Sequence, residues 1–404
     1  MKRSPAAKSM CIRSIALAAA LSSALTFAGS PGAQAAARPS LTIGVIAPID
    51  GGLTSFGRGI RNSVMLAVKL ALKRKDIPGW DIKVRAIDDS SDPAKGEAAA
   101  KTLAADKSVV AVIGPYNSGV ALLAAPVLNK ANLVLISPSN TLTSLTVGDD
   151  PAHPKRQWKT YFRMVGPDSQ QAKFLATEAK KLGYTTAAVV SETKAVSQGL
   201  ADEFADAFKA EGGKVTVQKT VPDAATAPDF AEFLAAAAPT KPQVIFFGGE
   251  YNVAATLRTA ATTAGLTIPL MGGDGMFDPA FISGAGASAA GSYASSVGLA
   301  FDQDSAILAF TSLYRTEGFA DPASDYGVYA YDATKAVISV LEKPLTGKTK
   351  LPPGIRRTVV RELQGSRRIG LTGKVGWDDY GDTNEPRFTL YRVEGTPPEW
   401  EIVF

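Results

Sequence analysis

Three hydroxyl side chains follow two apolar segments of the chain that are separated by a helical pattern. The segments VVAVIGP (109–115) and LVLISPS (133–139) are typical of strands buried on both faces. Ser118 follows the first strand. Ser139 ends the second segment, and Thr141 follows it. Ligands of open parallel sheets bind at the carboxyl ends of strands, where helix N-termini present free N–H groups. These hydroxyls therefore predict a cradle for a small anion such as a carboxylate.

The two hydroxyls expected to donate to the carboxylate are Ser118 and Thr141. Backbone N–H groups around Ser139 and Asn140 are expected to assist them. The same residue types also cap helices and turns, and capping and ligand binding can coexist. Tyr116, in the first of the two loops, is a candidate for an aromatic wall beside the ligand.

The elements that must position these residues alternate between strand and helix patterns from residue 41 to residue 271. Such alternation indicates an α/β fold with parallel sheets and helices on both faces. The first helix is expected at Arg58–Lys73, which places Phe56 in the loop before it. A mature chain of about 370 residues is too long for one core and predicts two domains.

Motifs that would indicate an enzyme are weak. The single histidine, His153, lies in a proline-containing loop, so the sequence offers neither a Ser-His-Asp triad nor a histidine-based metal site. Residues 346–349 (TGKT) lack the upstream glycine of a phosphate loop, and residues 284–289 (GAGASA) do not follow the first strand of a βαβ unit. We expect no catalytic residue, no metal and no cofactor.

The first 35 residues have the three-part pattern of a secretory signal. A basic start precedes an apolar run at residues 15–27 that is too short to span a bilayer. Ala33-Gln34-Ala35 then fits a cleavage site, so we expect the mature chain to begin at Ala36, or at Arg38 if the overlapping site is used. The basic residues of this segment are Lys2, Arg3, Lys8 and Arg13.

The net charge depends on this segment. The whole chain carries +5 at pH 7, and four of these charges lie in the signal, which has no acidic residue, so that +1 remains. A charge this small argues against a nucleic-acid partner.

The single cysteine, Cys11, precedes the apolar run and is badly placed for a lipid anchor. We expect a soluble monomer in the periplasm.

Six phrases occur along the mature chain in this order: VIGPYNSG, LISPSNTLTSLT, FFGGE, PLMGGDGMFD, YAYDATKAV and GWDDYGD. Together they resemble the Leu/Ile/Val-binding proteins of bacterial ABC importers, the type I periplasmic binding proteins. The resemblance implies two doubly wound Rossmann-like lobes joined by three hinge crossings, near Gly166, Val297 and Asp382. It assigns residues 36–166 and 298–382 to lobe 1, and residues 167–297 and 383–404 to lobe 2.

The resemblance also implies residues for the second end of an α-amino acid. Asp274, after the strand PLMGG, aligns with the family's acidic residue for the ligand ammonium, a charge-assisted pair. Phe56 and Tyr326 align with aromatic residues at the cleft. The alternative is that Asp274 is a turn aspartate between two glycines and that the aromatic residues only pack loops.

Two positions depart from the family pattern. Glu250 stands where the family has a tyrosine after FFGG, and Val196-Ser197 stands where Tyr-Gly is common. If Glu250 points into the cleft, it repels anionic ligands and favours a ligand with extra positive charge or extra hydrogen-bond donors. If it points outward, it is a solvated loop residue.

The resemblance implies the extracytoplasmic solute-binding component of an ABC importer. Such a protein closes two lobes around an amino acid, of the branched-chain type or related, and the permease recognises the closed form. The alternative is a sensory or regulatory ligand-binding protein of the same fold that recognises a small amide or carboxylate. Neighbouring permease and ATPase genes would favour import.

Overall fold

The computed structural model describes residues 38–150, 153–298 and 305–403. The predicted signal segment lies outside these residues. Residues 38–404 form one unit by their contacts. Within the described ranges, no helix is both long enough and apolar enough to cross a membrane.

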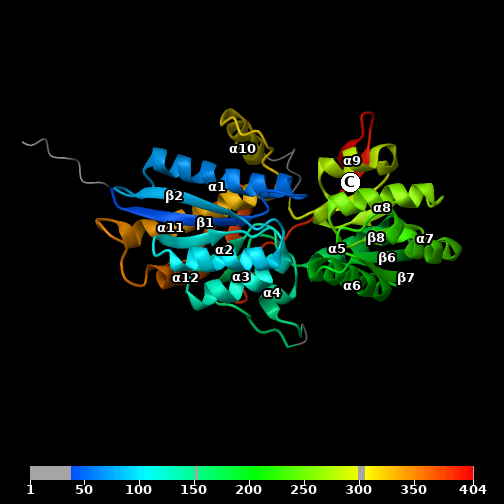
Figure 1. Ribbon diagram of the computed structural model, residues 1–404, viewed down its shortest axis with the longest axis horizontal. Coiled ribbons are helices and arrows are strands. Elements are labelled where there is room, and N and C mark those ends of the chain that lie inside the picture. Colours follow the sequence, from blue (N-terminus) through cyan, green and yellow to red (C-terminus); the bar gives the residue numbers. More distant parts are fainter. Residues whose placement is uncertain (1–37, 151–152, 299–304, 404) are drawn as a thin grey trace, which may run out of the picture. The chain divides into compact units, whose positions relative to one another are not determined.

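The first sheet contains five parallel strands in the order β2-β1-β3-β4-β5. All five run in the same direction, so their carboxyl ends meet at one edge (Figure 1). The strand order reverses between β1 and β3, because the chain goes from β1 outward to β2 on one side and from β3 outward to β5 on the other. This reversal opens a crevice between the loops at that edge. The strands are β1 (Ser40–Ala47), β2 (Asp81–Asp88), β3 (Val109–Ile113), β4 (Val134–Ser137) and β5 (Tyr161–Arg163).

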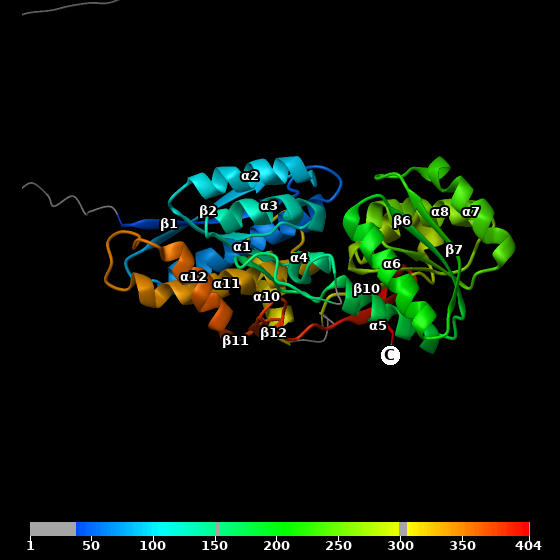
Figure 2. The same ribbon diagram turned by 90° about the horizontal axis from the view of Figure 1, so that it is seen from below.

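Helices cover both faces of this sheet, because successive side chains of each buried strand point to opposite faces. Figure 2 shows α2 and α3 on one side, and α1, α11 and α12 on the other. Val112 of β3 packs under α2 and α3, and its neighbours Ala111 and Ile113 pack in the cluster of α1 and α11. The helices are α1 (Thr54–Arg74), α2 (Pro93–Ala105), α3 (Ser118–Lys130), α4 (Ser144–Val147), α10 (Ser305–Thr316), α11 (Asp325–Leu345) and α12 (Ile355–Gly365).

The second sheet contains seven strands in the order β14-β13-β10-β9-β8-β6-β7. The five strands from β6 to β10 are parallel, and β13 and β14 are added to the sheet antiparallel. A separate ribbon of two strands, β11 and β12, precedes them in the chain. The strands are β6 (Thr186–Glu192), β7 (Lys214–Val221), β8 (Val244–Phe247), β9 (Leu270–Gly272), β10 (Tyr293–Ser296), β11 (Arg367–Gly370), β12 (Gly373–Gly376), β13 (Thr389–Glu394) and β14 (Glu399–Ile402).

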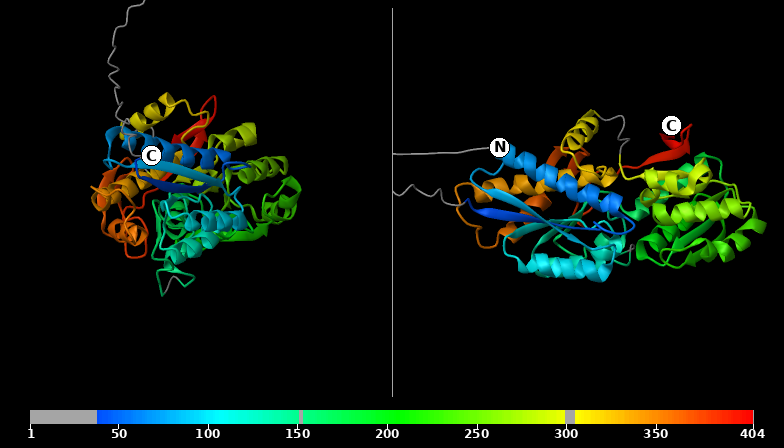
Figure 3. Two further views of the ribbon diagram at one scale, coloured as in Figure 1. Left: turned by 60° about the vertical axis from the view of Figure 1, so that its left-hand side comes forward. Right: turned by 45° about the horizontal axis from the view of Figure 1, so that its top comes forward.

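Helices cover this second sheet in the same way. The helices α5 and α6 pack on one face, and α7, α8 and α9 belong to the core cluster of the other. The C-terminal hairpin of β13 and β14 lies beside α9 (Figure 3). Trp400 of the hairpin stacks on Phe281 of α9. The helices are α5 (Asp168–Lys181), α6 (Ala195–Ala210), α7 (Ala231–Ala237), α8 (Tyr251–Thr263) and α9 (Pro279–Ala285), with short 3₁₀ turns η1 (Ala227–Phe230), η2 (Ala238–Thr240), η3 (Asp274–Met276) and η4 (Gly286–Ala289).

The prediction of an α/β fold with two doubly wound lobes is confirmed. One expected boundary is wrong: α1 begins at Thr54, so Phe56 lies in its first turn and not in the loop before it. The side chain of Leu53 packs in the core just before the helix, and no side-chain cap marks the start in the sequence. By contrast, the cap predicted at Asp92 is present, since its carboxylate accepts from the backbone N–H of Ala94 at 2.8 Å.

The chain passes between the two sheets three times, after β5, after β10 and after β12. Between β5 and β6 it contributes α5 to the second sheet, and after β10 it returns to supply α11 to the first. The lobe boundaries that we place at residues 166/167, 297/298 and 382/383 stay predictions.

Asp89, directly after β2, predicts how stability depends on pH. It is fully buried and accepts a hydrogen bond from the backbone N–H of Ser91 at 2.8 Å. Burial raises the pKa of Asp89 to about 7, and the neighbouring carboxylates of Asp88 and Asp92 act in the same direction. A carboxyl whose pKa is higher in the folded state holds its proton more tightly there. Its stabilising contribution is therefore complete at low pH and is lost as pH rises through about 7.

We expect Asp89→Asn to become more stable relative to the parent protein as pH rises from about 5 to about 8. The difference in the free energy of unfolding should grow by at most about 1.4 kcal/mol for each unit by which the pKa values of the folded and unfolded states differ. Urea unfolding at both pH values measures this difference, with the exposed Asp149→Asn as control. An unchanged difference between the two pH values would contradict the assignment.

Candidate ligand-binding site

The loop after β3 brings Tyr116, Asn117 and Ser118 to the edge of the first sheet. Gly114 makes this possible, because its φ of +107° favours glycine and a Cβ there would lie 1.9 Å from the carbonyl oxygen of Ile46. Ser118 is the first residue of α3, so its hydroxyl stands beside the free N–H groups of that helix. The hydroxyl oxygen accepts from the backbone N–H of Leu142 at 3.3 Å, which leaves its proton free to be donated.

The loop after β4 is tied to the first loop by side chains. The Ser137 hydroxyl donates to the carbonyl of Pro115 at 2.9 Å and accepts from the backbone N–H of Asn140, also at 2.9 Å. The Asn140 amide donates to the carbonyl of Tyr116 at 2.6 Å, and its Oδ1 accepts from the Tyr161 hydroxyl at 3.1 Å. Asn140 is fully buried and holds the two loops together, whereas Ser139 and Thr141 line the pocket beside Ser118.

A buried arginine also holds the loop after β4 in place. Arg163, the last residue of β5, pairs with Asp382 and donates to the carbonyl of Leu142 at 2.9 Å and to the hydroxyl of Thr146. Its own carbonyl accepts from the indole N–H of Trp377 at 2.9 Å. Because Asp382 and Trp377 come from near the third crossing, the loop of Thr141 is coupled to that part of the chain.

Asp274 reaches the pocket from the second sheet. It begins η3, directly after β9, and its carboxylate accepts from the amide of Gln171 at 2.9 Å and from the hydroxyl of Tyr326 at 2.6 Å. Both partners are neutral. Burial raises the pKa of Asp274 above its ordinary value, and the hydrogen bonds from Tyr326 and Gln171 offset only part of this effect.

Four aromatic rings pack together near this carboxylate. Phe56 stacks on Tyr116 with ring centroids 4.7 Å apart, and its edge contacts Tyr251 and Tyr326 at 5.2 and 5.1 Å. Tyr116 lines the pocket, and Tyr326 touches it through the hydrogen bond to Asp274. Phe56 is buried behind these rings and lines a neighbouring, more open cavity of about 700 Å³.

Glu250 points into the pocket, not into solvent. It is the N-cap residue of α8 and is 6% exposed. Its carboxylate accepts from the Asn117 amide at 2.7 Å and from the Lys194 ammonium at 2.6 Å. The other departure, Val196-Ser197, lies in the first turn of α6: Val196 lines the pocket, and the Ser197 hydroxyl accepts from the backbone N–H of Glu192.

The structure therefore brings six of the nine predicted residues to the lining of one pocket, and the other three, Asn140, Phe56 and Tyr326, lie beside it. The open volume of the pocket is about 40 Å³, which is room for only a few water molecules. Asn140 lies behind the loops and Phe56 lies behind Tyr116 and Tyr326. The predicted residues that line the pocket are Tyr116, Ser118, Ser139, Thr141, Glu250 and Asp274.

Four residues of the site were not predicted as functional from the sequence. Lys194 forms ion pairs with Glu250 and Glu192. Gln171 donates a hydrogen bond to Asp274, and Asn117 donates one to Glu250. Asn117 stands inside the matched phrase VIGPYNSG, so its place beside Ser118 was a usable signal. The other three lie on segments that no local pattern connects with the pocket.

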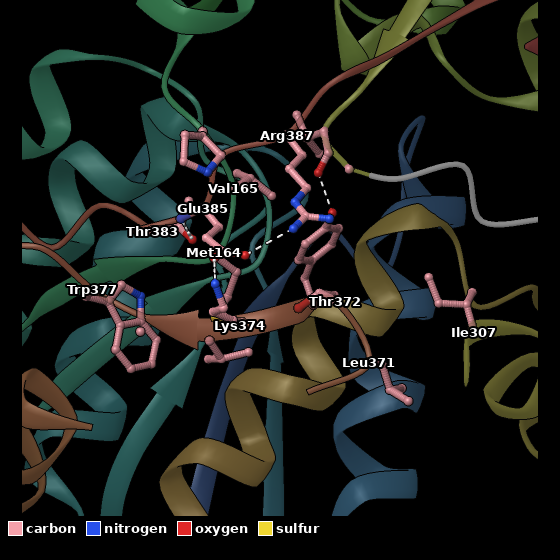
Figure 4. A pocket seen from close by; sticks show the side chains of 17 residues that line it. Met164, Val165, Ile307, Leu371, Thr372, Lys374, Trp377, Thr383, Glu385 and Arg387 are labelled. Atoms are coloured by element: carbon pink, nitrogen blue, oxygen red, sulfur yellow. Dashed lines mark hydrogen bonds and ion pairs between the residues drawn. The ribbon is translucent and has the colours of Figure 1, made fainter. Parts of the chain in front are cut away.

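A second cavity lies where the chain crosses between the sheets, and it makes a weaker candidate. Figure 4 shows that its charged side chains point toward one another. The Glu385 carboxylate lies 2.7 Å from the ammonium of Lys374 and 3.1 Å from the guanidinium of Arg387. Its charges are thus already paired, and none of the predicted site residues lines it.

His153 is exposed, and its ring Nδ1 lies 2.8 Å from the carboxylate of Asp150. In the ranges that the structure describes, no three His, Cys, Asp or Glu residues are grouped so that they could hold a metal ion.

Comparison with known proteins agrees with the fold. The family model described as periplasmic binding protein matches residues 40–397, which is most of the chain. The chain belongs to this family. The resemblance to Leu/Ile/Val-binding proteins that the six phrases carry is confirmed.

Curated members of the periplasmic binding protein family match the chain over nearly their whole length. One is Leu/Ile/Val-binding protein homolog 3 of Brucella melitensis, 26% identical over 376 residues, which are 92% of this chain and 96% of the relative. Another is the leucine-, isoleucine-, valine-, threonine- and alanine-binding protein of Pseudomonas aeruginosa, 25% identical over 88% of this chain and 90% of the relative.

Solved structures of periplasmic binding proteins share the fold. A leucine binding protein from Thermotoga maritima superposes with a TM-score of 0.76 at 23% identity, covering 89% of this chain and 97% of the other. A solute binding protein of an ABC transporter from Rhodopseudomonas palustris, in complex with 3,4-dihydroxybenzoic acid, gives 0.74 at 22% identity, covering 90% and 96%. Both identities are low, so these structures establish the fold and not the ligand.

Asn140→Ala should destabilise the fold, because the carbonyl of Tyr116 and the hydroxyl of Tyr161 would lose a buried hydrogen-bond partner. We expect a loss of about 1–3 kcal/mol in the free energy of unfolding, measured by urea unfolding. The matched control is Asn252→Ala on the exposed face of α8, which should change stability by less than about 0.5 kcal/mol. Equal stability of the two variants would show that Asn140 does not hold the loops.

Proposed function

We propose that the protein is the extracytoplasmic binding component of an ABC importer and that it holds an amino acid, of the branched-chain type or related, in the pocket of Ser118, Thr141 and Asp274. The predicted signal segment at residues 1–35 and the names of the curated relatives support this role. The protein acts as a periplasmic monomer that delivers its ligand to a permease, without a cofactor and without chemistry of its own.

The carboxylate of the ligand binds at the first sheet. Ser118 and Thr141 donate their hydroxyl protons. The backbone N–H groups of Ser139 and Asn140, which we expected to assist, already donate to the Ser137 hydroxyl and hold the loop in place instead. Support comes from the place of Ser118 at the start of the 13-residue helix α3, because anions are stabilised at helix N-termini. Tyr116 and Tyr326 form the aromatic wall, which Phe56 supports from behind.

The ammonium of the ligand binds at the second sheet, to Asp274. This assignment rests on one observation: a buried carboxylate lines the pocket with two neutral hydrogen-bond partners. Removal from water disfavours the charged carboxylate, and a cation at hydrogen-bonding distance would restore it. A zwitterion that spans the pocket therefore stabilises the state in which the two sheets' loops are close together.

The ligand itself can be found by thermal shift. A ligand that binds only the folded state raises the midpoint of unfolding by mass action. The exported protein should be screened against amino acids, amides and small carboxylates.

Asp274→Asn should weaken binding of the ligand found in that screen by at least roughly tenfold, because removing one partner of a buried charge pair typically costs about 2–5 kcal/mol. Calorimetry measures the affinity. The control is Asp206→Asn, which removes the same charge from an exposed position on α6 and should leave affinity unchanged. If Asp274→Asn binds as tightly as the parent protein, the ligand has no ammonium at this position, and the amino-acid assignment is wrong.

A further inference from the structure

One wall of the pocket is formed by a chain of charged and polar side chains that contact one another. The Lys194 ammonium lies 2.6 Å from one carboxylate oxygen of Glu250 and 3.3 Å from a carboxylate oxygen of Glu192. The other oxygen of Glu250 accepts from the Asn117 amide at 2.7 Å. All four residues line the pocket, and Asn117 comes from the first sheet whereas the other three come from the second.

Two acceptors in this wall are buried without a hydrogen-bond partner. They are Oδ1 of Asn117 and Oε2 of Glu192, on residues that are 8% and 0% exposed. A buried acceptor without a donor is unfavourable, and an unpaired polar group in a functional pocket marks a place where a ligand group can bind. These two acceptors thus lack a hydrogen-bond donor.

The wall also offers one donor of its own. An ammonium has three N–H groups, and Lys194 directs them at Glu250 and Glu192, which leaves one for a further acceptor. Burial alone would lower the pKa of Lys194, but the carboxylates of Glu250 and Glu192 raise it, so the side chain stays charged. Lys194 therefore balances the charge of Glu250, and burial raises the pKa of Glu192, which favours the uncharged form of that side chain, so that a second cation is not required.

This set of partners distinguishes between three kinds of ligand side chain. An aliphatic side chain would leave the free acceptors of Asn117 and Glu192 unpaired and would press against a buried ion pair. A cationic side chain would compete with Lys194 for the same carboxylates. A neutral group with both N–H donors and a carbonyl acceptor matches the wall, since it can donate to the free oxygens and accept from Lys194.

We propose that the pocket selects an α-amino acid whose side chain ends in a neutral carboxamide, and that Asn117, Glu192, Lys194 and Glu250 are the residues that determine this specificity. The inference rests on the proposed function, because it takes the α-carboxylate and ammonium to be held by Ser118, Thr141 and Asp274. Val196 and Leu200 line the pocket beside this wall and contact the aliphatic part of the side chain.

Asparagine and leucine test the proposal directly, because the two side chains have nearly the same shape and differ in hydrogen bonding. Calorimetry on the exported protein should give a dissociation constant at least tenfold lower for asparagine, or for its longer homologue glutamine, than for leucine. Sites built to hydrogen-bond a ligand reject analogues that lack the group, often by much more than tenfold. Ornithine is the cationic probe and should bind more weakly than the better of the two amides.

A double variant tests which residues are responsible. Lys194→Met combined with Glu250→Leu replaces this ion pair by apolar side chains of similar size. Glu192 then loses its cation, and because burial already raises the pKa of this carboxyl, it can hold a proton instead. It should reverse the preference, so that leucine binds more tightly than asparagine. The control is Lys209→Met combined with Asp206→Leu, which removes an exposed Lys–Asp pair from α6 and should keep the parent's preference. Thermal unfolding of each variant checks that it is folded.

The outcomes separate this proposal from the proposed function. Tighter binding of leucine or of ornithine by the parent protein would overturn the carboxamide specificity and leave an amino-acid importer in place. Binding of no amino acid at all would overturn both. An unchanged preference in the folded double variant would show that Lys194 and Glu250 do not determine it.

Discussion

The interaction on which the site depends is the removal of the Asp274 carboxylate from water. A carboxylate that leaves water without a cation loses much of its hydration energy, and neutral hydrogen-bond donors return only part of it. Gln171 and Tyr326 supply such donors, from α5 and from α11. The helix α5 packs on the second sheet and α11 packs on the first, so the hydrogen bonds of Asp274 connect the two sheets. A ligand cation bound to Asp274 therefore acts on both sheets.

The rest of the pocket follows from where strands end. Parallel strands bring their carboxyl ends to one edge, and in each sheet the loops at that edge carry the polar groups of the site. In the first sheet, Asn140 and Ser137 bind the loops to each other, and Arg163 with Asp382 holds them from below. The hydroxyls of Ser118 and Thr141 are thus presented by loops that hydrogen bonds hold in place, and we propose that they donate to the ligand.

The sequence predicted this part of the structure well for a physical reason. Strand–loop–helix units are local, so an apolar run followed by hydroxyls at a helix start is visible in a few consecutive residues, as at Val109 to Ser118. Asp274 and Tyr326 required the family resemblance, since an aspartate between glycines has several ordinary roles. The first turn of α1 was missed because no side-chain cap precedes it, and Phe56 was placed in a loop as a result.

The charged wall was beyond prediction from local patterns. Lys194 lies 56 residues from Glu250 along the chain, and only the pairing of β6 with β8 brings the ends of their strands together. From the sequence, Glu250 could have been a solvated loop residue or an unpaired charge in the cleft. The structure shows that it lines the pocket and is paired with Lys194 and Asn117. Our proposal of a neutral ligand group rests on this pairing. The fold of the family accommodates ligands as different as leucine and a dihydroxybenzoic acid in the solved structures, so the lining side chains and not the fold decide specificity.

The central claim of this account is that one small zwitterion binds to loops of both sheets and holds them together. Small-angle X-ray scattering of the exported protein, with and without a saturating concentration of its amino-acid ligand, tests this claim most directly. The account predicts a smaller radius of gyration in the bound state, because the pocket of about 40 Å³ can admit an amino acid only after the loops have parted, and the ligand then closes them. Superimposable scattering curves at a ligand concentration shown by calorimetry to saturate the protein would contradict it.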